Sequence, residues 1–148
     1  MPHSSFSSSP ALARIEQAYR RWGETLGGNL DEVLETFTED VEIRTLLPDD
    51  GSTPVRGLYR GRDGARRYFA DMFGAFDLLE HVADRLIVDA DGTALVMVGR
   101  CRLRHRASGA EMGSPLIDVC ELRDGGVSRL TEMFDTFAFH RATVGAPA

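Results

Sequence analysis

One acidic side chain stands out because it lies among apolar residues. The segment Glu111–Arg123 alternates in the manner of a β-strand, and Asp118 falls on its apolar face together with Leu116 and Cys120. A carboxyl group removed from water has a raised pKa, so it can act as a general acid, or as a general base near neutral pH. Asp118 is therefore the first candidate for a catalytic residue.

A second carboxyl group, that of Glu132, lies in the segment Val127–Phe139. The phase of this segment that carries Leu130 and Phe134 also carries Glu132, and we expect this phase to face the interior. The opposite phase, which includes Arg129, is the alternative. Two carboxyl groups in one dry pocket acquire different pKa values and can serve as acid and base. The competing interpretation is that each carboxylate forms a structural ion pair with an arginine.

His81 is the third catalytic candidate, at the start of a predicted strand, where an imidazole could shuttle protons. A structural role is the alternative. Cys101 and Cys120 fall on one face of neighbouring strands, and we interpret them as small apolar residues. No cluster of His, Cys, Asp and Glu has metal-ligand spacing, and no Gly-x-Gly-x-x-Gly motif occurs. We therefore expect neither a metal nor a cofactor.

The composition excludes several classes of function. The chain has 148 residues and a net charge of −6, and all 17 of its basic residues are arginine. The absence of lysine removes Schiff-base chemistry, and the acidic balance argues against a nucleic-acid partner. No apolar run approaches the roughly 18 residues that cross a membrane, and the first residues lack the apolar core of a secretory signal. We expect a bacterial, cytoplasmic protein with reduced cysteines.

The first half of the chain is predicted to be helical. Apolar residues recur at helical spacing in three segments, at about residues 10–26, 29–37 and 62–76. Tyr19 and Trp22 lie on the buried face of the first segment, and Tyr68 and Phe69 lie on that of the third. These helices would present aromatic side chains to the interior.

The second half is predicted to consist of strands. Together with one earlier strand, they cover Val41–Leu47, Leu79–Val88, Thr93–Arg106, Glu111–Arg123 and Val127–Phe139. In the third of these, Met97 and Cys101 face inward and a series of arginines faces outward. This order predicts an α+β domain at residues 10–140, with helices on one face of a curved sheet, a cavity at its open end, and flexible segments at 1–9 and 141–148.

The order of several short motifs resembles the nuclear transport factor 2-like superfamily, in its SnoaL-like polyketide cyclase and ketosteroid isomerase branch. The motifs lie at Phe37–Val41, Gly61–Ala65 and Glu132–Asp135, within about residues 12–139. The resemblance implies a cone-shaped barrel, in which a strongly curved, mostly antiparallel sheet wraps around three helices from the N-terminal half. It also implies a pocket inside the cone and a homodimer packed through the outer face of the sheet.

The resemblance implies roles for individual residues as well. Asp118 matches the position at which ketosteroid isomerases place the protonated acid of their oxyanion hole. Their carboxylate base would fall at Thr45, and their first-helix tyrosine would fall near Arg21 or Trp22, with Tyr19 close by. Scytalone dehydratases have a histidine near His81. In limonene-type epoxide hydrolases an aspartate occupies the position of Glu132, but here their remaining partners are replaced by Gly99 and Cys101.

We therefore expect a small cofactor-independent protein that binds an apolar, oxygenated small molecule and acts on it by acid–base catalysis, as in a cyclisation, an isomerisation or a hydration. Asp118, Glu132 and His81 would be catalytic. The predicted ligand-binding residues are Tyr19, Trp22, Thr45, Phe69, Met97, Cys101, Leu116, Leu130 and Phe134. The alternatives are a non-catalytic ligand-binding or dimerisation module and a subunit of a larger complex.

Overall fold

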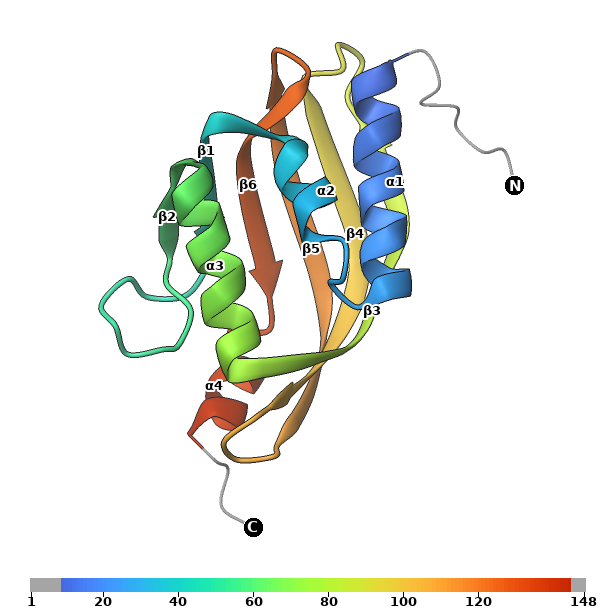
Figure 1. The fold of residues 1–148 in the computed structure, drawn as a ribbon. Helices are drawn as coiled ribbons and strands as arrows, with labels where there is room; N and C mark the ends of the chain where they lie inside the picture. Colours follow the sequence, from blue (N-terminus) through green and yellow to red (C-terminus); the bar gives the residue numbers. More distant parts are fainter. Residues whose placement is uncertain (1–8, 145–148) are drawn as a thin grey trace.

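The alternating segments of the second half form one curved sheet, which the helices cover on its concave face (Figure 1). The computed structural model describes residues 9–144. In this part of the chain the helices are α1 (Pro10–Thr25), α2 (Leu30–Glu35), α3 (Gly61–Ala75) and α4 (Thr136–Thr143). The strands are β1 (Phe37–Thr45), β2 (Leu58–Arg60), β3 (Phe76–Val88), β4 (Ala94–His105), β5 (Glu111–Arg123) and β6 (Gly126–Phe134).

The strands lie in the order β2-β1-β6-β5-β4-β3. Strands β3 to β6 form an antiparallel meander, β1 pairs antiparallel with β2, and the pairing of β1 with β6 is parallel. The sheet does not close on itself, because β2 and β3 remain at its two edges. The predicted α+β class, with a curved and mostly antiparallel sheet around the helices, is confirmed.

Helix α1 begins and ends where the sequence indicates. The hydroxyl oxygen of Ser9 accepts a hydrogen bond from the backbone N–H of Leu12, and Pro10 occupies the first turn. At the other end Leu26 adopts a left-handed conformation, with φ of 51°. Gly23 lets the helix approach β3 closely, since a Cβ atom there would lie 2.4 Å from the backbone oxygen of His81.

Two irregularities bend the long strand β3. Its register with β4 shifts between Leu78 and Glu80 and again between Ala83 and Arg85. Each shift inserts one extra residue, which changes the face to which the following side chains point. Opposite the second shift, Gly99 of β4 allows close backbone contact, because a Cβ atom there would lie 2.0 Å from the oxygen of Val82.

Several predicted boundaries differ from those of the structure, including the starts of β1 at Phe37 and of β3 at Phe76. The last strand ends at Phe134, because the carboxylate of Asp135 accepts a hydrogen bond from the N–H of Ala138 and begins helix α4, which turns Phe139 into the interior. The second helix stops at Glu35, because Phe37 already belongs to β1. The short strand β2 was not predicted.

The flexible segments expected at residues 1–9 and 141–148 lie largely outside the described residues. Within the described part, helix α4 continues through residues 141–143.

The arginines of β4 point away from the helices, as predicted, and they pair with acids of the same chain. Arg100 contacts Glu80 and Asp84, while Arg104 contacts Asp77. These side chains are about half exposed, so each pair stabilises the fold by no more than about 1 kcal/mol. None of the helices in residues 9–144 is long and apolar enough to cross a membrane.

Candidate active site

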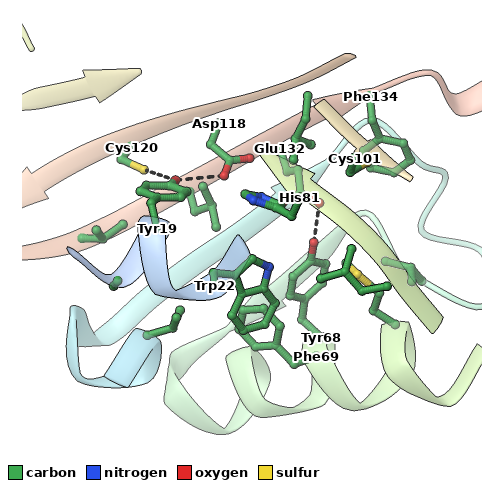
Figure 2. A pocket seen from close by; sticks show the side chains of 18 of the residues that line it. Tyr19, Trp22, Tyr68, Phe69, His81, Cys101, Asp118, Cys120, Glu132 and Phe134 are labelled. Atoms are coloured by element: carbon green, nitrogen blue, oxygen red, sulfur yellow. Dashed lines mark hydrogen bonds between the residues drawn. The ribbon is translucent and has the colours of Figure 1, made fainter. Parts of the chain in front are cut away.

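A cavity of about 100 Å³ lies between the helices and the concave face of the sheet. Its wall is mainly aliphatic and aromatic. The acidic, phenolic and imidazole groups that reach it belong to Tyr19, Tyr68, His81, Asp118 and Glu132 (Figure 2). A cavity of about 150 Å³ holds benzene in another protein. A single six-membered ring is therefore near the limit of this conformation, and a larger ligand requires lining side chains to move.

Asp118 enters the cavity from the centre of β5. Its side chain is 3% exposed, and its Oδ2 accepts a hydrogen bond of 2.8 Å from the hydroxyl of Tyr19 (Figure 2). Burial raises the pKa of the Asp118 carboxyl well above its usual value, and the negative charge of Glu132 raises it further. The other oxygen, Oδ1, accepts no hydrogen bond from a donor group of the described residues, and the carboxyl group shares a hydrogen bond with that of Glu132 when the pair holds a proton.

Glu132 is the direct cross-strand partner of Asp118, on β6. Its Oε1 accepts a hydrogen bond of 2.5 Å from the hydroxyl of Tyr68. Burial raises the pKa of the Glu132 carboxyl, whereas the hydrogen bond from Tyr68 stabilises the charged form and lowers it. Both carboxyl groups therefore keep a proton to higher pH than in water, and the pair has one acid and one base while it holds a single proton.

The two tyrosines act as hydrogen-bond donors to the carboxyl groups. Tyr19 comes from α1 and Tyr68 from α3, and burial raises the pKa of both phenols well above the usual value. The sequence placed Tyr68 on a buried helix face but did not assign it to the site. The available signal was the residue type, because a buried tyrosine hydroxyl usually has a hydrogen-bond partner.

His81 reaches the cavity from β3. Its ring is nearly parallel to that of Tyr19, with an interplanar angle of 15° and 6.5 Å between the ring centroids. Burial lowers the pKa of His81 to about 4, so the imidazole is neutral at physiological pH. Its Nδ1 atom is buried without a hydrogen-bond partner.

The structure brings most of the predicted site residues to one cavity. Besides Tyr19, His81, Asp118 and Glu132, the predicted residues on its wall are Trp22, Phe69, Cys101, Leu116, Leu130 and Phe134. Their catalytic or ligand-binding roles stay predictions.

Two predicted residues do not line the cavity. The hydroxyl of Thr45 donates to the backbone oxygen of Arg56 and accepts from the N–H of Leu47, so the adjoining loop engages it. Met97 is fully buried and packs against the wall residues Cys101 and Leu116 without lining the cavity itself. Neither residue therefore lines this cavity, and their expected contact with a ligand stays a prediction.

The two cysteines are buried as free thiols. Burial raises the pKa of both Cys101 and Cys120 to about 12, so neither is a thiolate at neutral pH. Among residues 9–144 no group of three or more His, Cys, Asp and Glu side chains is arranged to hold a metal ion.

Comparison with known proteins identifies one family. The family model of the SnoaL-like domain matches residues 15–130. Among curated proteins, none matches the chain.

Several solved structures share the fold. An isomerase candidate from Bacillus subtilis is 18% identical, with a TM-score of 0.76 over 92% of this chain and 96% of that one. A candidate SnoaL-like polyketide cyclase from Jannaschia sp. CCS1 is 23% identical, with a TM-score of 0.73 over 95% and 97%. TerC, co-crystallised with polyporic acid, is 22% identical, with a TM-score of 0.72 over 92% and 99%.

Proposed function

This chain belongs to the SnoaL-like domain family, and from that premise we propose that it is a cofactor-independent enzyme of the isomerase or cyclase type. The observation that carries the proposal is the pair Asp118 and Glu132. The two carboxyl groups are cross-strand partners on the wall of an apolar cavity, and tyrosines rather than arginines hold them. Structural ion pairing, the competing interpretation of these residues, does not fit that environment.

The proposed reaction is proton transfer next to a carbonyl group. Glu132, as carboxylate, removes a proton from the carbon beside the carbonyl, while Asp118 donates a hydrogen bond or a proton to the carbonyl oxygen. From a β,γ-unsaturated ketone the product is a dienol. Glu132 then returns its proton to the γ-carbon while Asp118 takes back the proton of the oxygen, which restores the carbonyl and completes an isomerisation of the double bond. In a water-excluded cavity both groups act more strongly than in solution, because the surroundings screen charge less.

The proposed substrate is an uncharged, largely apolar molecule with oxygen functions. None of the cavity-lining residues is an arginine, so a carboxylate or phosphate would find no cation beside it. The aromatic wall, which includes Trp22 and Phe69, suits a ring. The co-crystal of the structural neighbour TerC with polyporic acid supports the assignment of a small-molecule ligand.

The test is deuterium exchange next to the carbonyl of cyclohexanone, followed by NMR in D2O. The wild-type protein is expected to accelerate exchange, and Asp118→Asn and Glu132→Gln are each expected to reduce that acceleration by about 10²-fold or more. Glu121→Gln is the matched control, because Glu121 is an exposed acid of β5 that pairs with Arg129 on the outer face. It should retain the wild-type rate.

A further variant tests whether the hydrogen bond from Tyr68 to Glu132 sets the pH dependence of the exchange rate. Tyr68→Phe removes the hydrogen bond that lowers the pKa of Glu132, so the rate should reach its maximum at higher pH. If wild-type exchange is no faster than buffer although ligands bind in the cavity, the protein is a binding module rather than an enzyme. Equal rates for wild type and Asp118→Asn would also contradict the mechanism.

We also propose that two copies pair through the outer face of the sheet. Ile117 and Met133 are cross-strand partners there and are each 36% exposed, and Ile87 of β3 is 45% exposed. Exposed apolar side chains that adjoin on one face are the kind of surface that a second copy covers.

A further inference from the structure

Two buried polar atoms on the cavity wall meet no donor or acceptor group of the described residues, apart from the proton that the carboxyl groups of Asp118 and Glu132 can share. They are Oδ1 of Asp118 and Nδ1 of His81, in side chains that are 3% and 9% exposed. Among residues 9–144 the one other such atom is Nε of Arg62, a residue that does not line the cavity. Buried polar groups are nearly always hydrogen-bonded, to protein, to water or to a ligand. Two exceptions in one cavity therefore point to what the cavity binds.

The two atoms come from strands that are not paired with each other. Asp118 lies on β5 and His81 on β3, with β4 between them. The second oxygen of Asp118 is already occupied by Tyr19, which orients the carboxyl group. The backbone of His81 is held by the close contact with Gly23 of α1. Figure 2 shows both side chains at the cavity, approaching from different strands.

We propose that the ligand of this cavity carries two oxygen functions on an apolar framework, one that meets Oδ1 of Asp118 and a second that meets Nδ1 of His81. This inference rests on the proposed function, because it takes the same cavity as the ligand site. It makes His81 a residue that determines specificity, separate from the acid pair.

The second oxygen function is a hydroxyl group. A neutral imidazole has one N–H donor and one acceptor nitrogen, and a hydroxyl can both donate and accept, so it pairs with Nδ1 in either tautomer. The first function is a carbonyl or a hydroxyl, since both accept a hydrogen bond from a protonated carboxyl. The ligand class is thus a small, uncharged hydroxyketone or dihydroxylated ring, and a ligand with one oxygen function leaves His81 unsatisfied.

The test compares phenol with catechol, resorcinol and hydroquinone in calorimetric titrations of the full chain. These three diols place their oxygens at increasing separation, so their ranking measures the spacing of the two wall atoms. At least one diol should bind wild-type protein about tenfold or more tightly than phenol, because it satisfies a second buried group. In His81→Phe this ratio should fall to about one, while phenol still binds.

A control and a second readout protect the test against a misfolded variant. His140→Phe removes an exposed imidazole of α4 and should keep the wild-type ratio. In wild-type protein with 15N-labelled histidine, the Nδ1 signal of His81 should move when the favoured diol binds and stay unchanged with phenol.

The outcomes separate this inference from the proposed function. If phenol binds and no diol binds more tightly, water satisfies His81 and the inference is overturned, whereas the acid pair and its exchange reaction are unaffected. If the favoured diol is selected through His81 but cyclohexanone does not exchange, the inference holds and catalysis fails. Failure of all four compounds to bind overturns the inference as well.

Discussion

Acidification from pH 6.5 to pH 4 should destabilise the protein through His81. Burial lowers the pKa of this imidazole from 6.5 to about 4. Between those values the unfolded chain binds a proton that the folded protein excludes, so falling pH favours unfolding. The contribution of His81 is thus fully present above pH 6.5 and is lost toward pH 4. A difference of about 2.5 pKa units corresponds to about 3 kcal/mol of unfolding free energy.

The acid pair acts in the opposite direction. Because burial raises the pKa values of Asp118 and Glu132, the folded protein holds protons that the unfolded chain releases as pH rises above about 4. Their contribution therefore decreases with rising pH and partly cancels that of His81 in the wild-type curve. The difference between wild type and His81→Phe isolates the imidazole, since no hydrogen bond joins His81 to either carboxyl group.

The measurement is urea denaturation at closely spaced pH values, with the fluorescence of Trp22, the single tryptophan of the chain, as the signal. The unfolding free energy of wild type minus that of His81→Phe should increase by about 3 kcal/mol from pH 4 to pH 6.5 and then become constant. His140→Phe, which alters an exposed histidine, should show no such trend. A difference that is flat across this interval would refute the argument, because the buried imidazole would then accept a proton as readily as one in water.

Two further predictions concern packing and assembly. Gly23→Ala should lower the unfolding free energy by about 2 kcal/mol, because the added Cβ would lie 2.4 Å from the backbone oxygen of His81. Gly74→Ala in α3 is the control and should be neutral or stabilising, because nothing lies within 4 Å of its Cβ position. Equal effects of the two substitutions in urea denaturation would contradict the close contact at Gly23. Sedimentation should show a dimer that Ile117→Asp converts to a monomer, whereas the charge-changing control Arg20→Asp, on the exposed side of helix α1, should remain a dimer. A monomeric wild type would exclude this interface.

The sequence predicted the position of Asp118 because strand β5 is regular. The register of β4 with β5 has no shift from Ala94 to Arg104, so strict alternation sends Asp118 to the same side as Leu116 and Cys120. The inward phase of Glu132 followed from the same alternation in β6. Alternation is a local property of an extended backbone, and it can be read from the chain wherever no residue is inserted.

The sequence did not predict where that last strand ends. The residues after Phe134 continue an apolar pattern that suits a strand, and Phe139 was assigned to it. The structure instead begins helix α4 at the Asp135 cap and buries Phe139 against Phe76 and Phe134. The choice between strand and helix for so short a segment depends on which surface is available to cover its apolar side chains.

Thus the sequence by itself determined the α+β class, the inward phases of the regular strands and the two carboxyl groups among apolar neighbours. The tertiary structure alone decided which groups meet them. Strict alternation along β3 from the inward-facing Phe76 would place the side chain of His81 on the outer face of the sheet. Leu79 is an extra residue in the pairing with β4, and it shifts the alternation so that His81 faces the cavity. The contact of Tyr68 with Glu132 likewise joins residues 64 positions apart. A register shift and a contact between distant elements arise from how strands and helices pack together, and no local pattern specifies them.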